Sequence, residues 1–266
     1  MTDWLSVMTY NVRYDNPDDG EHGWENRRRA VANTIRFRRP DLLGLQEPLT
    51  HQLDYLRENL PAFEFVGDAR VDGDEKGEFS PIGYRTSRFD CVETDTFWLS
   101  PAPDEPGSVG WDARYPRIVT WARLRDRQTD TAFLHANTHF SHDGPEARRE
   151  GARVLRERLD AISEGEPVVL TGDFNCVTGD PPYETLTAPA AGNRELVNAR
   201  DQSRHGHYGP NTSVTDFEHL VPKRKIDHVF VSPGVEVFQH GVCTDLRTDE
   251  AYPSDHFPVL ADLDLG

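Results

Sequence analysis

The chain has 266 residues, of which 36% are hydrophobic and 10% aromatic, enough for a sizeable core and, by length, for one large domain over residues 1–266. No run approaches the roughly 18 apolar residues of a membrane span, and the N-terminus lacks the regions of a secretory signal, so a transmembrane protein is excluded and a cytoplasmic location is expected. The net charge of −17, from 29 Lys and Arg against 46 Asp and Glu, argues against holding polyanions by bulk attraction.

The first half of the chain predicts strand and helix in alternation, followed by antiparallel sheet. Residues 5–11 predict a strand, and residues 24–39 carry apolar side chains at helical spacing until Pro40. A buried strand at 41–46 and a helical stretch from Gln52 to Leu60 repeat the alternation. Strand signals then follow one another between turns rich in Pro, Gly and Asp, at residues 82–85, 92–99, 118–124 and 131–140.

The second half contains the clearest predicted helix, at residues 144–162, where one apolar stripe is flanked by arginines that we expect on a solvated face. Three short apolar runs predict buried strands, at 168–171, 226–231 and 257–263. Two long loops, 68–80 and 100–116, are rich in Gly, Asp and Pro. Loops of this length in a compact domain are often functional.

The basic residues are almost all arginine, since Lys76, Lys223 and Lys225 are the three lysines. An acidic, lysine-poor surface stays hydrated in concentrated salt, where the Debye length falls to about 3 Å at 1 M. We therefore expect a halophilic protein, with an ordinary acidic cytosolic protein as the alternative. The three cysteines are too widely spaced for paired zinc ligands, so any metal is expected on oxygen and imidazole ligands.

Polar residues stand where the predicted strands end, which is where a sheet delivers catalytic groups into a cleft. Taken singly, each is more often a turn, cap or packing residue; Asp227, for example, reads as a strand start and His139 as a buried, satisfied histidine. The candidate site residues among them are four carboxylates, two imidazoles and two amides, namely Glu47, Asp173, Asp227, Asp255, His139, His256, Asn11 and Asn175. The six segments are Tyr10-Asn11, Leu45-Gln46-Glu47, Asn137-Thr138-His139, Gly172-Asp173-Phe174-Asn175, Ile226-Asp227-His228 and Ser254-Asp255-His256.

This ordered set resembles the endonuclease/exonuclease/phosphatase superfamily of deoxyribonuclease-like, metal-dependent phosphoesterases, in an uncharacterised prokaryotic branch. The resemblance runs from residue 10 to residue 257. It implies an α/β fold, a four-layer α/β/β/α sandwich in which helices flank two mixed, mainly antiparallel sheets. This architecture accommodates both the early alternation and the antiparallel middle.

The resemblance also implies roles for the individual residues. Glu47 is the main Mg²⁺ ligand, with Asn11 and Asp255 beside it, and Mn²⁺ is a possible substitute. Asp173 orients or deprotonates the attacking water, and Asn175 steadies that water or a phosphate oxygen. Asp227 holds His256 in one tautomer, while His256 and His139 donate to the phosphoryl oxygens. Whether Asp173 or His256 is the base stays open.

The substrate is expected to be read by the loops. Arg117 is predicted to bind the substrate phosphate, and Arg114, Trp111 and Tyr115 are candidates that are equally explained as packing residues. The segment Lys223-Arg224-Lys225 is a plausible contact for a nucleic-acid backbone or a solubilising turn. The acidic loop at 68–78 would repel a long duplex.

The leading hypothesis is a Mg²⁺-dependent phosphodiesterase or nuclease acting on nucleic acid, DNA or RNA, or on nucleotides. The alternative is a phosphomonoesterase or phospholipase-C-like hydrolase acting on sugar, inositol or lipid-headgroup phosphates. A binding protein on a retired nuclease scaffold is a third reading, and it predicts no Mg²⁺-dependent cleavage of any phosphate ester. We expect no membrane partner and no obligate protein partner.

Overall fold

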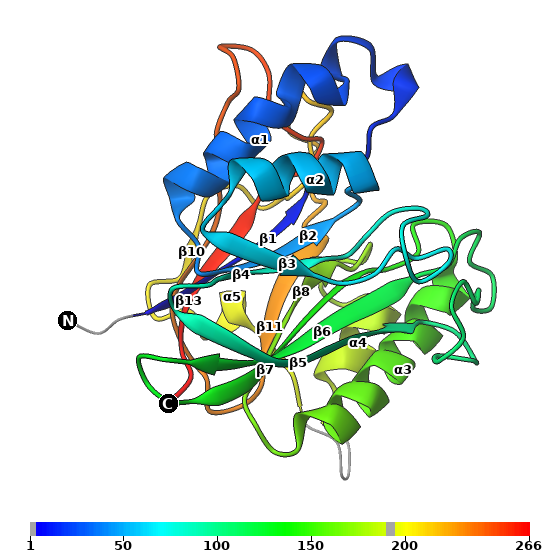
Figure 1. The fold of residues 1–266 in the computed structure, drawn as a ribbon, viewed down its shortest axis with the longest axis vertical. Helices are drawn as coiled ribbons and strands as arrows, with labels where there is room; N and C mark the ends of the chain where they lie inside the picture. Colours follow the sequence, from blue (N-terminus) through cyan, green and yellow to red (C-terminus); the bar gives the residue numbers. More distant parts are fainter. Residues whose placement is uncertain (1–3, 190–194) are drawn as a thin grey trace.

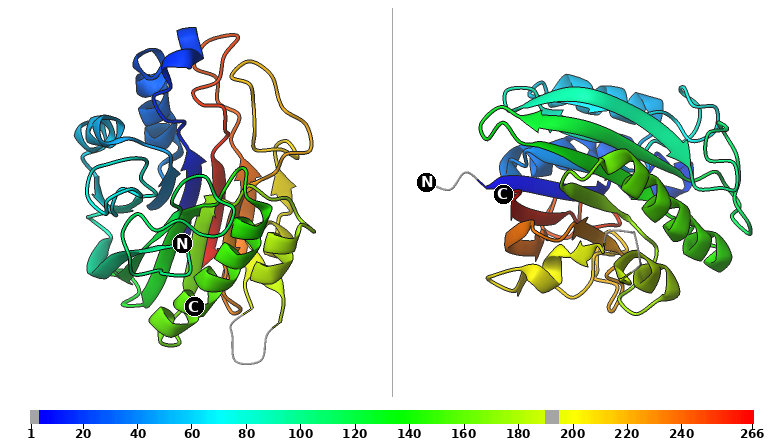
Figure 2. Two further views of the ribbon diagram at one scale, coloured as in Figure 1. Left: turned by 90° about the vertical axis from the view of Figure 1, so that its right-hand side faces the viewer. Right: turned by 90° about the horizontal axis from the view of Figure 1, so that it is seen from below.

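The computed structural model describes residues 4–189 and 195–266, and its strands form two sheets that pack face to face with helices outside (Figures 1 and 2). Helices α1 (Trp24–Arg38) and α2 (Thr50–Asn59) cover one outer face, and α3 (Pro145–Ser163) and α4 (Pro181–Thr187) cover the other. The predicted four-layer α/β/β/α sandwich is confirmed. Within the described ranges, no helix is long and apolar enough to cross a membrane.

The first sheet has seven strands in the order β10-β12-β13-β1-β2-β4-β3. β1 pairs with β2 in parallel and with β13 antiparallel, so segments from the two ends of the chain lie side by side. The strands are β1 (Leu5–Asn11), β2 (Leu42–Gln46), β3 (Phe63–Val66), β4 (Ile82–Arg85), β10 (His207–Tyr208), β12 (Glu236–Val242) and β13 (Val259–Asp264).

The second sheet has six strands in the order β5-β6-β7-β8-β11-β9. Its pairs are antiparallel except β7 with β8, which is parallel. The strands are β5 (Phe89–Trp98), β6 (Ile118–Asp126), β7 (Ala132–His139), β8 (Val168–Asp173), β9 (Val197–Asn198) and β11 (Asp227–Val231), and the remaining short helices are η1 (Pro17–His22) and α5 (Ala199–Gln202).

The central strands are apolar on both faces because each sheet is covered on both sides. In β2, Leu42 packs into the core between the sheets, whereas its neighbour Leu43 packs under α1 and α2. In β8, Val169 faces the other sheet and Leu170 faces α3 and α4. Such strands appear in the sequence as continuous apolar runs, which is why β1, β2 and β8 were predictable.

The two sheets approach each other closely beside Gly44 of β2. A Cβ atom at this position would lie 2.0 Å from Thr171 Oγ1 and 2.5 Å from Asn137 Oδ1 on the other sheet. Next to it, Gln46 Nε2 donates to Asn137 Oδ1 at 2.7 Å. Glycine therefore allows the backbone of one sheet to reach polar groups of the other, just below the edge where the polar strand ends gather.

One sequence-based expectation is wrong for α3. Its arginines were expected on a solvated face, but Arg156 is buried and donates to the carbonyl of Thr185 in α4. Arg149 and Arg153 do lie exposed. The apolar stripe is thus interrupted by one guanidinium that satisfies the end of a neighbouring helix.

Candidate active site

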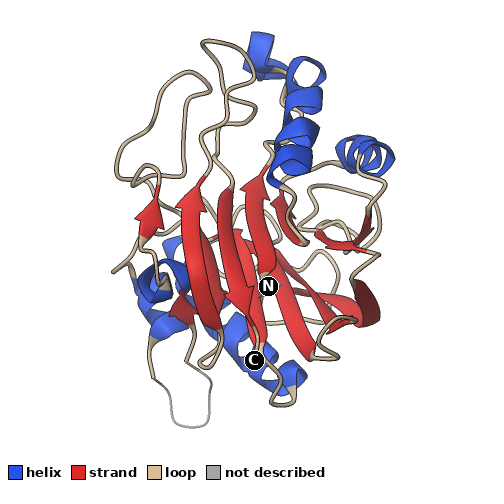
Figure 3. Ribbon diagram, turned by 90° about the vertical axis from the view of Figure 1, so that its left-hand side faces the viewer, coloured by secondary structure: helices blue, strands red, loops and turns tan. Residues whose placement is uncertain are grey.

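Strand direction and register bring the predicted residues to one edge of the sandwich, the upper edge in Figure 3. Asn11 ends β1 and Glu47 directly follows its parallel neighbour β2. In the other sheet, His139 and Asp173 end the parallel pair β7 and β8, and Asp227 begins β11 opposite Asp173. Parallel strands end at the same edge, and an antiparallel neighbour begins there, so the two sheets present their polar groups together. Asp255 and His256 join them from the loop before β13.

Asn11 links the carboxylates of the two sheets. Its Nδ2 donates to Glu47 Oε1 at 2.9 Å and to Asp173 Oδ2 at 3.1 Å, while its Oδ1 accepts from the backbone N–H of Arg13. The second oxygen of Glu47 accepts from the N–H of Tyr14. Two carboxylates from separate sheets are thereby held at fixed positions by one amide.

Asp255 lies close enough to Glu47 for their charges to interact. Burial, and then the charge of Glu47, raise the pKa of Asp255. The guanidinium of Arg13 lies 3.7 Å from Asp255 Oδ2, and Ser254 Oγ donates to the carbonyl of Asn11 at 2.8 Å. This arrangement fixes the loop before β13 against the end of β1.

Three residues of the site have a left-handed backbone, with φ of 57° at Arg13, 73° at Glu47 and 48° at Asn175. A side chain in this region is strained by about 1 kcal/mol or more, and such strain collects where the surrounding structure over-determines a functional position. The turns after β1, β2 and β8 therefore hold their polar side chains at some cost in stability.

His256 lies between two buried carboxylates. Its Nδ1 is 2.9 Å from Asp227 Oδ2, and its Nε2 is 3.8 Å from Asp173 Oδ2. Burial lowers the pKa of His256, but Asp227 and Asp173 outweigh it and raise that pKa well above the usual value. Burial and the charge of Asp227 raise the pKa of Asp173 to about 7. The cluster can thus hold a proton near neutral pH and pass it between carboxylate and imidazole.

His139 approaches the same carboxylate from the other side. Its Nε2 lies 3.4 Å from Asp173 Oδ2. Its buried Nδ1 lies 3.9 Å from Glu78 Oε2 and has no hydrogen-bond partner within residues 4–189 and 195–266. Burial, followed by the charges of Arg117 and Arg70, lowers the pKa of His139 well below its usual value. His139 is therefore a neutral imidazole. Asn175 donates from its backbone N–H to Asp173 Oδ1 at 3.0 Å and from Nδ2 to the Phe140 carbonyl.

Arg117 is 5% exposed and reaches the site from the 100–116 loop. Sequence reasoning missed three residues beside it. One is His142, whose Nδ1 accepts a hydrogen bond from Arg117 Nη2 at 2.8 Å, since a guanidinium can only donate. Arg70 and Glu78 form an ion pair of 2.6 Å on the 68–80 loop. The length of that loop signalled function, but nothing local in the sequence singled out these two residues.

The structure does not bring all the predicted cations to the site. Lys225 was offered as a contact for nucleic-acid phosphate, but its side chain is buried and its amine donates to the carbonyl of Asp227. Burial lowers its pKa to about 8. Arg114 stacks 5.3 Å from the ring of Tyr115, a packing role that the sequence had left open.

Oxygen ligands for a divalent cation are present. Asn11, Glu47 and Asp255 offer the hard oxygens that Mg²⁺ or Mn²⁺ prefers. Asp227 Oδ1 is buried and finds no hydrogen-bond partner in the part of the chain that the structure describes. A second group, Asp173, Asp227 and His256, places three ligand atoms within 4.8 Å of one another. The chemistry of the first donor set fits a metal ion, whereas in the second set His256 is held protonated by its two carboxylates.

A third group, Glu21, His22 and Glu218, has similar spacing, but its histidine is in a tautomer that does not suit a metal ion. Arg247 Nη2 donates to His22 Nδ1 at 2.8 Å, so the neutral ring carries its proton on Nε2. That proton faces Glu218 Oε1 at 3.5 Å. The nitrogen that would have to bind a metal has no free lone pair.

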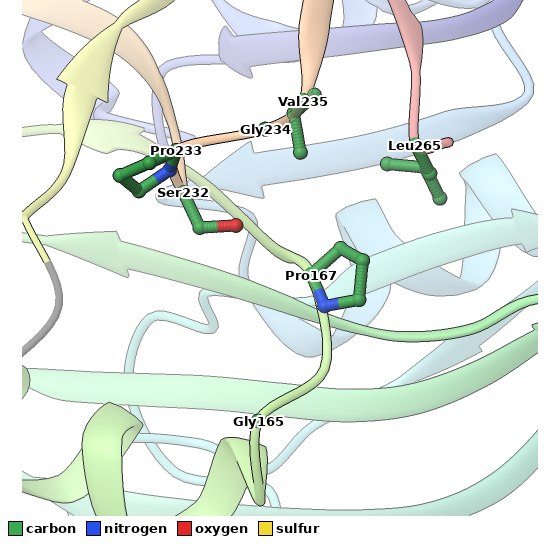
Figure 4. Close-up of a pocket in the computed structure, with 7 residues that line it drawn as sticks. All are labelled: Gly165, Pro167, Ser232, Pro233, Gly234, Val235 and Leu265. Carbon is green, nitrogen blue, oxygen red and sulfur yellow. The ribbon is translucent and has the colours of Figure 1, made fainter.

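The pocket drawn in Figure 4 lies at the opposite edge of the sandwich, where β8 starts and β11 ends. It is lined by Gly165, Pro167, Ser232, Pro233, Gly234, Val235 and Leu265. None of these side chains titrates, and Ser232 Oγ already accepts from the N–H of Val168. The chemistry of the molecule is therefore at the upper edge.

Two sheets sandwiched between helices, with carboxylates, imidazoles and amides at one edge, define a metal-dependent phosphoesterase. The model of the Endonuclease/Exonuclease/phosphatase family matches residues 8–256, and the chain belongs to this family. Its members are phosphoesterase hydrolases, so the chain is an enzyme of this class.

Solved relatives share the whole fold. A family member from Bacteroides vulgatus is 35% identical, with 100% of each chain covered and a TM-score of 0.92. The mannosyl-6-phosphatase Bt3783 of Bacteroides thetaiotaomicron is 36% identical, with 98% of this chain and 99% of that one covered and a TM-score of 0.92.

Among curated proteins, a probable RNA exonuclease of Schizosaccharomyces pombe is 25% identical over 198 residues, which cover 69% of this chain and 38% of that protein. The chain spans about two fifths of the length of the curated relatives it matches, with 39%, 42% and 38% covered.

Proposed function

We propose that the chain is a Mg²⁺-dependent phosphomonoesterase of small substrates, with a sugar phosphate as the substrate class. The observation that carries this proposal is the position of the site's cations. Arg70 and Arg117 are 9% and 5% exposed and lie within the site, whereas Lys225, offered for a nucleic-acid backbone, is turned into the protein. Enclosed guanidiniums suit one terminal phosphate better than a long chain of phosphates.

The comparison with solved structures supports the same choice. The mannosyl-6-phosphatase is 36% identical to this chain over almost the whole length of both. The sequence alone had favoured nucleic acid and kept sugar phosphates as the alternative. We propose a sugar phosphate as the first candidate substrate and nucleic acid as the second.

In this proposal Glu47, Asn11 and Asp255 hold the metal ion, which would draw charge from the phosphate oxygens. Asn11 also keeps Glu47 and Asp173 at fixed positions. Mn²⁺ is a second candidate ion, since its ligand preferences are similar.

The remaining residues bind and move protons. Asp173 takes the proton of the attacking water, while His256, held as an imidazolium by Asp227 and Asp173, donates to a phosphoryl oxygen. Asp227 fixes the orientation of His256 through Nδ1. His139, neutral and donating from one ring nitrogen, hydrogen-bonds a phosphoryl oxygen. Asn175 steadies the water, and Arg117 binds the substrate phosphate. Negative charge that develops on the phosphoryl group is therefore stabilised by hydrogen-bond donors that are already oriented toward it.

The decisive experiment measures phosphate release from mannose 6-phosphate and 4-nitrophenyl phosphate, in concentrated KCl with Mg²⁺, beside cleavage of end-labelled DNA and RNA. We expect phosphate release that Glu47→Gln lowers at least about 100-fold. Arg125→Gln, an exposed residue paired with Asp130, is the control. Cleaved oligonucleotides without phosphate release would contradict the proposal.

Removal of the metal gives a separate test. Chelation by EDTA should abolish activity, and added Mg²⁺ should restore it. Activity that persists in EDTA would contradict a metal-dependent reaction.

A nuclease is the second candidate function. The specific observation in its favour is the 25% identity to a probable RNA exonuclease. Lys223 and Arg224 remain on the surface as contacts for a short single strand. The same assay distinguishes the two functions by its labelled oligonucleotides.

We also propose that the enzyme works in the cytoplasm of a salt-adapted cell. The net charge of −17 and the presence of three lysines among 29 basic residues support this setting. Every assay above is therefore designed for concentrated KCl.

A further inference from the structure

The 68–80 and 100–116 loops, expected from the sequence to be functional, bring two arginines beside His139. Arg70 lies on the 68–80 loop, and Arg117 directly follows the 100–116 loop. The charges of both guanidiniums act on the pKa of His139, after burial, and the charges of Glu47 and Asp173 act in turn on Arg117. The Glu78 carboxylate, whose Oε2 lies 2.6 Å from Arg70 Nη1 and 3.9 Å from His139 Nδ1, places Arg70 beside the site.

Each guanidinium is oriented by one neighbour and leaves N–H groups unused. Arg70 Nη1 donates to Glu78 Oε2 at 2.6 Å, and Arg117 Nη2 donates to His142 Nδ1 at 2.8 Å. Among the described residues, the buried Nε of Arg70, and both Nε and Nη1 of Arg117, find no hydrogen-bond partner. Buried charged donors without a partner are costly, so their presence at a site indicates where a ligand's acceptors lie.

The packing around these side chains keeps them in place. The backbone carbonyl of Arg70 accepts from Trp98 Nε1 at 2.7 Å. The guanidinium of Arg70 lies 5.1 Å from the centre of the Tyr115 ring. The ring of His142 is stacked against the same tyrosine, with 6.5 Å between the ring centres. Tyr115 thus joins the two arginines through one aromatic contact and one imidazole.

We propose that Arg70 and Arg117 form an arginine clamp that binds the terminal phosphate of the substrate and selects phosphomonoesters over phosphodiesters. This inference rests on the proposed function and deepens it. A monoester phosphate carries nearly two negative charges at pH 7 and three terminal oxygens, all good acceptors. A diester has one charge and two terminal oxygens, so its second ester group would leave part of the clamp unpaired in a buried place.

The test compares two substrates with the same leaving group, 4-nitrophenyl phosphate and bis(4-nitrophenyl) phosphate. The ratio of their kcat/KM values is measured for the wild type, Arg70→Gln and Arg117→Lys, with Arg125→Gln as the matched control. Each clamp substitution should lower the monoester-to-diester ratio by about 10- to 100-fold, the effect of one charged hydrogen-bond partner. Arg125→Gln should leave the ratio unchanged.

Phosphate binding supplies a readout that does not depend on turnover. Inorganic phosphate should raise the melting temperature of the wild type and inhibit it competitively, and its inhibition constant should rise about tenfold in Arg117→Lys. Arg117→Lys keeps the charge and removes the planar fork, so a folded variant with weakened phosphate binding supports the clamp.

The outcomes separate the two proposals. A wild type that cleaves diesters and releases no phosphate from monoesters would overturn the proposed function and the clamp with it. A wild-type monoesterase whose ratio survives both substitutions, or whose two activities fall in parallel, would overturn the clamp alone.

Discussion

The proton-transfer groups depend on single buried contacts. His256 keeps a raised pKa because Asp227 and Asp173 outweigh the effect of burial. Asp227 is fully buried, so its charge is little screened by solvent. One carboxylate thereby controls both the tautomer and the charge of the imidazole.

Asp227→Asn should therefore lower kcat about 10²- to 10⁴-fold, the usual contribution of a positioned acid or base. Because the variant no longer supports the imidazolium, the loss of activity at alkaline pH should begin at a lower pH than in the wild type. A pH profile of kcat checks both effects. Asp130→Asn, an exposed carboxylate paired with Arg125, is the control, and an unshifted profile in Asp227→Asn would contradict the assignment.

Arg27 is a buried cation held by backbone carbonyls. It is fully buried and donates to the carbonyls of Val12, Arg13 and His22. These carbonyls belong to the segment that leads from Asn11 to α1. Arg27 thus shapes the turn that carries the first polar residue of the site.

Arg27→Lys should destabilise the fold by about 3 kcal/mol, because the fork that satisfies several carbonyls is lost and the remaining charge is buried. Denaturant unfolding measures the change. Arg29→Lys on the same helix, where Arg29 is exposed, should cost less than about 0.5 kcal/mol. Equal effects of the two substitutions would contradict the role of Arg27.

At the scale of elements, what the sequence could predict depends on how regular each element is. β1 and β2 have apolar runs and end where expected, whereas β8 continues two residues beyond the predicted 168–171, to Asp173. β12 was missed because a bulge between Val237 and Gln239 interrupts its alternation. β3 is a four-residue strand, too short for periodicity to be decisive.

The site residues that the sequence could predict lie at the ends of regular strands, and those that it could not predict lie on a loop. Asn11, Glu47 and Asp173 lie at strand ends, so sheet geometry alone brings them together. Arg70 and Glu78 lie on a loop, and nothing in local periodicity encodes the path by which that loop returns to the site.

Two glycines test the packing of the elements. Gly44→Ala places a Cβ 2.0 Å from Thr171 Oγ1 and should cost about 1–3 kcal/mol or more by overpacking. At Gly151 in α3 the nearest atom to an added Cβ is Leu99 Cβ at 3.6 Å, so Gly151→Ala should stabilise by roughly 0.5–1 kcal/mol through helix propensity. Denaturation midpoints measure both, and a shift of the same sign in the two variants would contradict this account.

Buried histidines make the second sheet sensitive to acid. His135 in β7 donates or accepts through Nε2 at 3.0 Å from Thr171 Oγ1, and burial lowers its pKa to about 3. The unfolded chain binds a proton near pH 6.5, so the stability that this residue contributes is complete above pH 6.5 and is lost as the pH falls toward 3.

His135→Gln should accordingly flatten the dependence of unfolding free energy on pH by about one proton, near 1.4 kcal/mol per pH unit between pH 4 and 6. Urea unfolding at several pH values measures the slope. His219→Gln, whose side chain is 77% exposed, should leave the slope as it is. A slope unchanged by both substitutions would contradict a neutral His135.

For the molecule as a whole, charge sets the conditions of stability. With 46 acidic and 29 basic residues, self-repulsion is strong in dilute buffer and is screened by salt. The melting temperature should rise by about 5 °C or more between dilute and concentrated KCl, which corresponds to roughly 2 kcal/mol for a chain of this size. Thermal unfolding is measured in KCl and in an osmotically matched sucrose series. The comparison distinguishes screening of charge repulsion by salt from stabilisation by a solute that is excluded from the protein surface. A flat KCl curve would favour an ordinary acidic protein.

The pairing of β1 with β13 has a consequence for synthesis. β1 is made first among the strands, and β2, its parallel neighbour, follows within about 40 residues, since they span Leu5–Asn11 and Leu42–Gln46. The other side of β1 stays bare until Val259–Asp264 leaves the ribosome. While the chain between β2 and β13 is synthesised, the nascent chain therefore exposes an unpaired strand edge, a template for association with other chains. Prematurely terminated products should be insoluble, and full yield should depend on chaperones that shield this edge until the last strand arrives.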